Sequence, residues 1–288
     1  MKPVKTYASA GAFRRALEDR LAALAKTEGI DVARMRRQVA FDRLLVRLFV
    51  NNQLPWLLKG GYALELKLAV ARTTKDIDLG LEYVFADGEN LANTILSFLQ
   101  ECAAQTVCDF FEFAIGEPMM DLDGAPYGGA RYPVEAILDG RTFAKFHLDV
   151  GTGDVQRLPH EMAQPRDWLG FAGIPAPAFP SISREEHFAQ KIHAYTLVRG
   201  EKPNSRVKDL IDLVLLIDSK ALDAERLQRA IKDTFKRRKT HAIPAALEAP
   251  PQFWKPTFER MADECKIDPD IEMQFQKVQT FFAALHLP

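Results

Sequence analysis

The sequence is poor in cysteine and contains no long hydrophobic run. Its three cysteines, Cys102, Cys108 and Cys265, fit neither a disulfide framework nor the spacing of a zinc site. The longest apolar stretches, such as residues 210–217, are far too short to cross a bilayer. The N-terminal segment also lacks the apolar core of a secretory signal. We therefore expect a soluble, cytoplasmic protein with no membrane partner.

The overall charge excludes a globally basic nucleic-acid-binding protein. The net charge is −1 over 288 residues. Hydrophobic residues make up 47% of the chain and charged residues 27%, which allows a sizeable core and argues against disorder. Short basic runs occur at residues 14–15, 36–37 and 236–239. Such runs are most often solvated helix faces, and contact with a nucleic acid is the alternative.

The N-terminal half combines helical and extended patterns. Apolar residues recur at helical spacing over residues 10–26 and 32–51. A short apolar segment at 56–59 is followed by Gly60-Gly61 and another helical stretch, which predicts a strand, a glycine turn and a helix. Alternation of polar and apolar residues then predicts several strands. The expected strands are 76–81, 110–115, 128–138 and 143–150, with a further helix at 89–101.

The C-terminal half is predicted to be mainly helical. Proline and glycine are frequent in residues 161–180, which we interpret as a linker. Ser183 and Glu186 then have the spacing of a capping box at a helix start. We therefore expect an α/β (α+β) protein with a mixed sheet in an N-terminal lobe, residues 1–160, and a helical lobe, residues 181–288. The helices of that lobe are expected at 184–199, 206–218, 223–238 and 270–285.

Asp76 and Asp78 are the first candidates for an active site. Side chains at positions i and i+2 of a strand lie on one face, about 7 Å apart at their Cα atoms. Two carboxylates in that arrangement can hold one Mg²⁺ or bridge two, as in phosphoryl-transfer enzymes. A solvated strand face gives the same pattern, so the pair indicates a metal site only together with its surroundings.

Gly60-Gly61 and nearby cations supply those surroundings. Glycines let the backbone approach a ligand closely, and the N–H groups at the start of the following helix can bind phosphate. Taken alone, the two glycines are equally consistent with an ordinary tight turn. Arg72 and Lys75 precede the aspartates. Either could pair with triphosphate oxygens or neutralise the carboxylates.

A third carboxylate follows on a later strand. Asp149 lies in an alternating segment, and an adjacent strand could bring it beside Asp76 and Asp78. Its role would be a metal ligand or a general base on an attacking hydroxyl. An exposed strand aspartate is the alternative, and Asp154 is a weaker candidate for the same role.

The helical half carries further charged candidates. Lys191 lies in the expected helix 184–199, and Lys208 and Asp209 lie near the start of the next helix. The two lysines could bind nucleotide phosphates, with Asp209 orienting one of them or a sugar hydroxyl. Lys208 and Asp212 are spaced i, i+4, so a surface ion pair is the alternative.

The order of these motifs resembles the AbiEii/AbiGii toxin family, nucleotidyltransferase toxins of type IV toxin–antitoxin systems that include the MenT-like toxins. The resemblance covers about residues 55–216, and one departure is Gly-Gly where the wider superfamily usually has Gly-Ser. A serine contact to phosphate is therefore missing. The likeness rests on Lys59-Gly60-Gly61-x-x-Leu64, Arg72-x-Thr74-x-Asp76-Ile77-Asp78-Leu79 and Arg206-x-Lys208-Asp209-x-x-Asp212-Leu213, with Asp149 and Lys191 between the last two.

This resemblance implies a polymerase-β-like nucleotidyltransferase fold, a divalent ion, Mg²⁺ or Mn²⁺, and an NTP donor. It implies transfer to RNA, in studied relatives the 3′ end of tRNA, and a cognate antitoxin as partner. By position, it makes Asp76 and Asp78 metal ligands, and Lys191 and Asp209 essential for transfer. The full candidate set is Asp78, Asp149, Lys191 and Asp209 for catalysis, Asp76, Asp78 and Asp149 for metal, and Lys59, Gly60, Gly61, Arg72, Thr74 and Lys208 for the nucleotide.

Three other functions stay open from the sequence. The chain could transfer a nucleotide to a protein or a small molecule, or it could transfer the γ-phosphate as a kinase-like phosphotransferase does. It could also be a non-catalytic interaction protein that keeps the fold.

Overall fold

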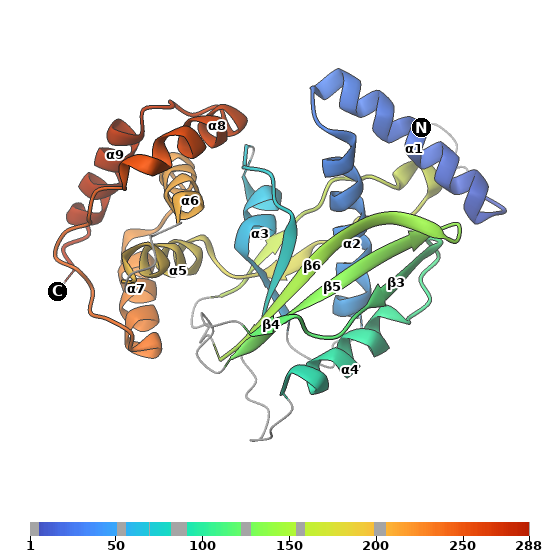
Figure 1. Ribbon diagram of the computed structural model, residues 1–288, viewed down its shortest axis with the longest axis horizontal. Helices are drawn as coiled ribbons and strands as arrows, with labels where there is room; N and C mark the ends of the chain where they lie inside the picture. Colours follow the sequence, from blue (N-terminus) through green and yellow to red (C-terminus); the bar gives the residue numbers. More distant parts are fainter. Residues whose placement is uncertain are drawn as a thin grey trace. The chain divides into compact units, whose positions relative to one another are not determined.

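The computed structural model describes residues 6–50, 56–68, 70–81, 91–121, 128–153, 159–198 and 206–287 (Figure 1). The chain packs as two compact units whose segments interleave in the sequence. The first unit contains residues 1–58, 74–153 and 162–180, and the second contains 59–73, 154–161 and 181–288. Within the described ranges, no helix has the length and apolar character needed to cross a membrane.

The first unit is built on a mixed sheet. Its described strands follow the order β3-β5-β6-β2-β1-β8-β7, with β4 paired to β5. Strand β6 lies parallel to β2 and antiparallel to β5, and β5 is also antiparallel to β3. The strands are β1 Trp56–Lys59, β2 Asp76–Leu81, β3 Phe111–Ile115, β4 Met120–Asp121, β5 Gly129–Leu138, β6 Arg141–Thr152, β7 Glu161–Ala163 and β8 Phe179–Ser181.

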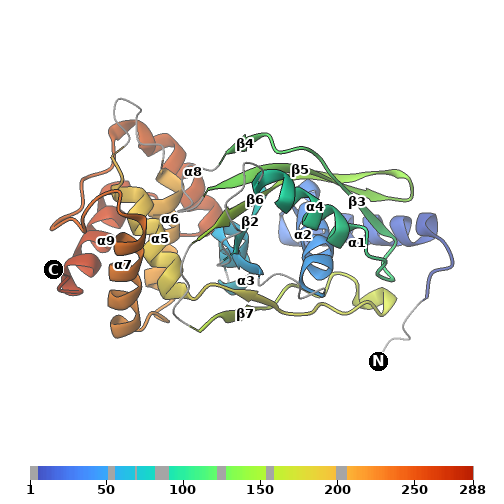
Figure 2. The same cartoon turned by 90° about the horizontal axis from the view of Figure 1, so that it is seen from below.

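Helices α2 (Val32–Val50) and α4 (Leu91–Ala103) pack against one face of this sheet, and α1 (Ala10–Glu28) packs on α2 (Figure 2). The ring of Phe146 on β6 lies 4.8 Å from that of Phe41 on α2, centroid to centroid. The Tyr132 hydroxyl on β5 donates to the Ala92 carbonyl over 2.8 Å. Because side chains alternate along a strand, the intervening residues of β5 and β6 face away from these helices.

The second unit is mainly helical. Helix α5 packs against α6 and α7, and α6 packs against α8 and α9. Helix α6 is central because almost all of its residues are buried, including Leu210, Leu213 and Leu216. The helices of this unit are α3 Gly60–Lys67, α5 Arg184–Thr196, α6 Val207–Asp218, α7 Ala224–Arg238, α8 Lys255–Cys265 and α9 Ile271–Ala284.

Most of the elements expected from the sequence are confirmed, as is the α/β class with a mixed sheet and a helical C-terminal half. The capping box at the start of α5 is present. The Ser183 hydroxyl accepts from the Glu186 amide over 3.1 Å, and the Glu186 carboxylate accepts from the Ser183 amide over 3.4 Å. Local signals of this kind depend only on neighbouring residues, which is why they are readable from sequence.

The connecting segments contain short elements that the sequence did not predict. Residues 161–180, which we interpreted as a linker, contain most of β7 and β8 and a short 3₁₀ helix, Gly170–Ala172. Strands of three residues are too short to show alternation. Helix α8 was not among the predicted helices; Pro256 lies in its first turn, where proline is tolerated. Asp154, the weaker candidate for the third carboxylate, lies outside the described residues.

Candidate active site

The polar face of β5, β6 and β2 carries the aspartates expected from the sequence. In the parallel register of β2 and β6, Asp76 lies opposite His147 and Asp78 lies opposite Asp149. In the antiparallel register of β5 and β6, Asp149 lies opposite Arg131. The fold of the first unit therefore brings three carboxylates and one guanidinium onto three adjacent strands.

Asp76 is held at the partly open side of this group. Its side chain is 33% exposed, and Oδ1 lies 3.2 Å from Nδ1 of His147. Its other oxygen, Oδ2, lies 3.8 Å from Nη2 of Arg131. A carboxylate with one solvent-facing side and two polar neighbours is oriented but still open to a ligand.

Asp149 is held more tightly, by Arg131. Nε of Arg131 donates to Oδ1 over 2.8 Å and Nη2 donates to Oδ2 over 2.7 Å, so the pair is bidentate. The hydrogen bonds from Arg131 to Asp149, and after them the charges of Asp149, Asp76 and Asp78, raise the pKa of Arg131 above its ordinary value. The arginine is therefore a fixed positive charge in the candidate site.

The residues of β2 fit a divalent ion in their donor chemistry. Among the described residues, no three histidine, cysteine or acidic side chains are arranged as a metal cage. Mg²⁺ does not need such a cage, since it is usually bound by one or two carboxylates together with substrate phosphates and water. Asp76 and Asp78 alternate with buried Ile77 and so present two carboxylates on one face.

Lys59, Gly60 and Gly61 belong to the second unit, where they form the start of α3. Lys59 is the N-cap residue, and its side chain makes no capping hydrogen bond. Gly60 has φ +67°, in the left-handed region that a side chain disfavours. The glycine therefore allows β1 to turn directly into α3, and the first amides of that helix are of the kind that binds anions.

The other cations and aspartates of the second unit form a buried ionic network. Arg72 donates from Nε and Nη2 to the two oxygens of Asp212, each over 2.9 Å. Lys191 on α5 donates from Nζ to Oδ1 of Asp209 over 2.9 Å and lies 2.9 Å from Oδ2 of Asp212. Arg72, Asp209 and Asp212 are all buried. Lys208 is exposed on α6, and in the first unit Thr74 is buried.

Burial and charge compete within this network. Burial alone would raise the pKa of Asp212, but Lys191 and Arg72 outweigh it and lower the pKa to about 2. Burial disfavours the charged form of Lys191, yet the carboxylates of Asp209 and Asp212 hold its pKa above the ordinary value. His187, one turn before Lys191, is buried next to these cations, and burial first and then Lys191 hold its pKa well below 6.5.

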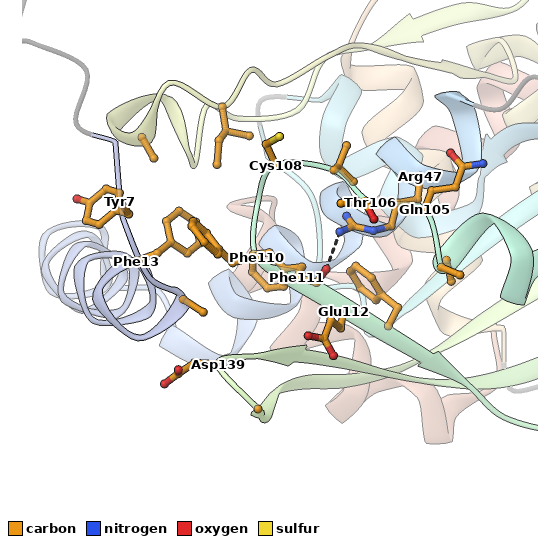
Figure 3. A pocket seen from close by; sticks show the side chains of 18 of the residues that line it. Tyr7, Phe13, Arg47, Gln105, Thr106, Cys108, Phe110, Phe111, Glu112 and Asp139 are labelled. Carbon is orange, nitrogen blue, oxygen red and sulfur yellow. Dashed lines mark hydrogen bonds between the residues drawn. The ribbon is translucent and has the colours of Figure 1, made fainter.

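A cavity of about 960 Å³ lies elsewhere in the first unit, lined by aromatic residues that include Tyr7, Phe13 and Phe110 (Figure 3). On one side of it, Arg47 donates to the Phe111 carbonyl over 2.6 Å. None of the residues expected to be functional lines this cavity.

A second, more open groove lies beside Asp76, with most of its residues on β3, β5 and β6 and with Arg37 reaching it from α2. Its volume is about 770 Å³, and its walls include Arg37, Lys75 and Lys145. Small or apolar residues, Ala114, Gly116 and Pro133, also line it. We call this feature the sheet-face groove.

Comparison with known proteins identifies the family. Residues 43–284 match the family described as "Nucleotidyl transferase AbiEii toxin, Type IV TA system", which is more than four-fifths of the chain. The chain belongs to this family. It is therefore a nucleotidyltransferase of the AbiEii toxin type, and the resemblance of its motifs to AbiEii toxins is confirmed.

A solved toxin structure shows the same fold, and a second structure aligns less closely. The nucleotidyltransferase toxin MenT4 from Mycobacterium tuberculosis H37Rv aligns with 92% of this chain and 98% of its own, at 18% identity and a TM-score of 0.57. JHP933 from Helicobacter pylori aligns with 87% of this chain and 92% of its own, at 15% identity and a TM-score of 0.47. A search of curated protein sequences found no match.

The AbiEii chain also contains site residues that its sequence did not single out. Arg131 and His147 contact the expected aspartates. Asp212, which the sequence suggested only as a surface ion-pair partner of Lys208, is instead buried and joins Arg72 to Lys191. Alternation could have placed His147 on the same strand face as Asp149. Arg131 could not be found in that way, because its pairing depends on the register between two strands.

Proposed function

We propose that this AbiEii-family chain transfers a nucleoside monophosphate from an NTP to the 3′ end of an RNA, a tRNA being the acceptor that fits best. The observation that carries the proposal is the carboxylate group on the polar sheet face, where Asp76 and Asp78 stand in register with His147 and Asp149. We further propose that the chain acts in the bacterial cytoplasm, that an antitoxin restrains it, and that Mg²⁺ or Mn²⁺ is its metal.

The proposed reaction is a direct displacement at phosphorus. A hydroxyl oxygen of the acceptor bonds to the α-phosphorus, the bond to the bridging oxygen breaks, and pyrophosphate leaves with the electron pair. A divalent ion bound at Asp76 and Asp78 would offset negative charge on the transferred phosphate. The chain itself contributes positioning, since His147 and Arg131 orient Asp76.

The proton of the attacking hydroxyl needs an acceptor near the same carboxylates. Asp78 and Asp149 are both candidates, because they are opposite each other in the β2–β6 register. Asp149 already accepts two hydrogen bonds from Arg131. Because both oxygens of Asp149 are engaged in this way, Asp149 is the less accessible of the two to the proton of the hydroxyl.

The sheet-face groove supports an RNA acceptor. Asp76 lines it, and besides Arg131, which is paired with Asp149, three further cations line it: Arg37, Lys75 and Lys145. Within the part of the chain that the structure describes, Arg37 and Lys75 have no carboxylate partner, and Lys145 pairs only across 3.4 Å with Glu135. Cations without tight partners are suited to phosphodiester groups, which dominate the affinity of proteins for nucleic acids.

For the second unit, we propose that the first amides of α3 at Gly60 and Gly61 bind triphosphate oxygens, with Lys59 and Lys208 as further contacts. Lys191 and Asp209 are proposed as residues on which transfer depends. We do not assign Arg72 to the nucleotide, because its Nε and Nη2 atoms already donate to the two oxygens of Asp212. It would support Lys191 through the shared aspartate, while Thr74 would support the strand start at Asp76.

The test is a transfer assay with α-labelled NTPs, Mg²⁺ and total tRNA. We expect label on RNA with the wild type and a loss of at least about 100-fold with Asp78→Asn, the scale of removing one group that stabilises developing charge. Asp19→Asn, an exposed aspartate on α1, is the matched control and should transfer normally. Equal labelling by the wild type and Asp78→Asn would refute the proposal.

The same assay separates the alternative functions. Label on protein or on a small alcohol would mean a different acceptor, and transfer from γ-labelled ATP would mean a phosphotransferase. Absence of any transfer, with NTP binding also absent by calorimetry, would favour a non-catalytic protein.

A further inference from the structure

The contact between Arg131 and Asp149 occupies a position that matters for metal binding. Arg131, on β5, and Asp149, on β6, lie opposite each other in the sheet, and Asp78, on β2, is the next residue in the same row. The side chains of Arg131 and Asp149 are 30% and 12% exposed, and both carboxylate oxygens receive a hydrogen bond. The guanidinium therefore sits directly among the carboxylates of the proposed site.

Arg131 also reaches a second carboxylate of the group. Its Nη2 atom, which donates to Asp149, lies 3.8 Å from Oδ2 of Asp76. In a paired-metal site, two ions about 3.5–4 Å apart are held between neighbouring carboxylates. The guanidinium of Arg131 lies between two carboxylates on adjacent strands in a comparable way.

The charges of this group leave room for one divalent ion. Asp76, Asp78 and Asp149 carry three negative charges, and Arg131 carries one positive charge, so two negative charges remain. One Mg²⁺ or Mn²⁺ neutralises them. On the carboxylates alone, a second divalent ion would leave an excess of positive charge next to a guanidinium that cannot lose its proton, so any second ion would have to be held by the triphosphate.

We propose that Arg131 takes the place of one metal ion, so that the chain holds a single divalent ion on Asp76 and Asp78 while Asp149 is a positioning residue bound to Arg131. This inference rests on the proposed function, because it concerns the same site. It differs from the metal-ligand role that the sequence suggests for Asp149. A guanidinium is suited to replace a metal ion here, since its planar fork can donate to both oxygens of a carboxylate and so holds that carboxylate in one orientation.

The number of bound ions can be measured without turnover. Mn²⁺ is titrated into the full chain with a saturating non-hydrolysable NTP analogue, and its electron paramagnetic resonance spectrum is recorded. We expect one Mn²⁺ per chain with the spectrum of an isolated ion. Asp149→Asn should keep that one ion with less than about a threefold change in affinity, whereas Asp78→Asn should lose it.

Arg131→Gln provides the complementary experiment. Without the guanidinium, Asp149 becomes available, and we expect a second Mn²⁺ to bind close enough to the first to broaden the spectrum. Arg131→Lys keeps the charge and should still bind one ion. Arg141→Gln is the matched control on β6, since Arg141 is exposed and pairs with Asp139. Circular dichroism checks that each variant is folded.

Two results would overturn the inference. One is a coupled pair of Mn²⁺ ions in the wild type, and the other is loss of the bound ion in Asp149→Asn with the fold intact. If the wild type still labels RNA in the transfer assay, the proposed function stands and only the single-ion inference fails. If neither Mn²⁺ binding nor transfer is observed, both fail.

Discussion

Lys191 on α5 donates from Nζ to Oδ1 of Asp209 on α6 over 2.9 Å, and both side chains are largely withdrawn from solvent, at 15% and 5% exposure. The same ammonium lies 2.9 Å from Asp212, which also binds Arg72. The two residues that the sequence motif marks as essential are therefore part of the ionic framework of the second unit. Their loss would affect stability as well as any contact with the nucleotide.

The first prediction concerns Lys191. Lys191→Met should lower the free energy of unfolding by about 3 kcal/mol, because it leaves two buried aspartates with less compensation. Urea denaturation followed by circular dichroism measures this. Lys277→Met is the matched control, since Lys277 pairs with Asp218 at the surface, and its loss should be below about 1 kcal/mol. Equal losses in the two variants would contradict the prediction.

The second prediction concerns His187, whose pKa is lowered chiefly by burial. In the described part of the chain, neither ring nitrogen has a hydrogen-bond partner. The unfolded chain takes up a proton at this histidine below pH about 6.5, whereas the native state does not. Stability should therefore fall as the pH is lowered from about 7 to 5, by up to about 1.4 kcal/mol per pH unit from this group.

The measurement for His187 is the free energy of unfolding at several pH values. His187→Leu removes the titrating group and should flatten the slope between pH 5 and 7. His160→Gln, at an exposed histidine, should leave the slope unchanged. An unchanged slope in His187→Leu would show that the imidazole is not held neutral in the native state.

Elements set by local patterns were predictable from the sequence. Residues 10–26 were expected to be helical and the helix spans Ala10–Glu28, with Ser9 as its N-cap and Gly29 at its end. The strand expected at 76–81 has those bounds. For the helix the signal is the period of apolar residues together with the cap residues, and for the strand it is the alternation of polar and apolar residues, in each case within a few positions of the chain.

Contacts that depend on strand register were not predictable. Alternation placed Asp149 on a strand face, but it could not show that Arg131 is opposite on β5 and Asp78 opposite on β2. A shift of one residue would turn each of these side chains to the other face. The network of Arg72 and Asp212 was also hidden, because 140 positions separate the two residues.

The third prediction concerns Asp109 beside the aromatic cavity. Its carboxylate accepts from Nε of Arg43 over 2.6 Å and from both Nη atoms of Arg47 over 2.9 and 2.8 Å. All three residues are buried. Asp109→Asn would leave two buried guanidinium groups uncompensated and should cost about 4 kcal/mol of stability. Asp139→Asn breaks an exposed pair with Arg141 and should cost less than about 1 kcal/mol. Thermal denaturation measures the loss of stability in each variant, and equal losses in the two would contradict the prediction.

The fourth prediction concerns the sheet-face groove and uses RNA binding without catalysis. An RNA hairpin with a single-stranded 3′ end is titrated in EDTA, and the affinity is measured at several salt concentrations. If Arg37 and Lys145 contact phosphates, Arg37→Ala and Lys145→Ala should each reduce the slope of log K against log salt by about 1. Lys26→Ala, an exposed lysine on α1, should leave the slope unchanged. Slopes equal to that of the wild type in both groove variants would place the RNA on another surface, while the carboxylate site would still be tested by the transfer assay.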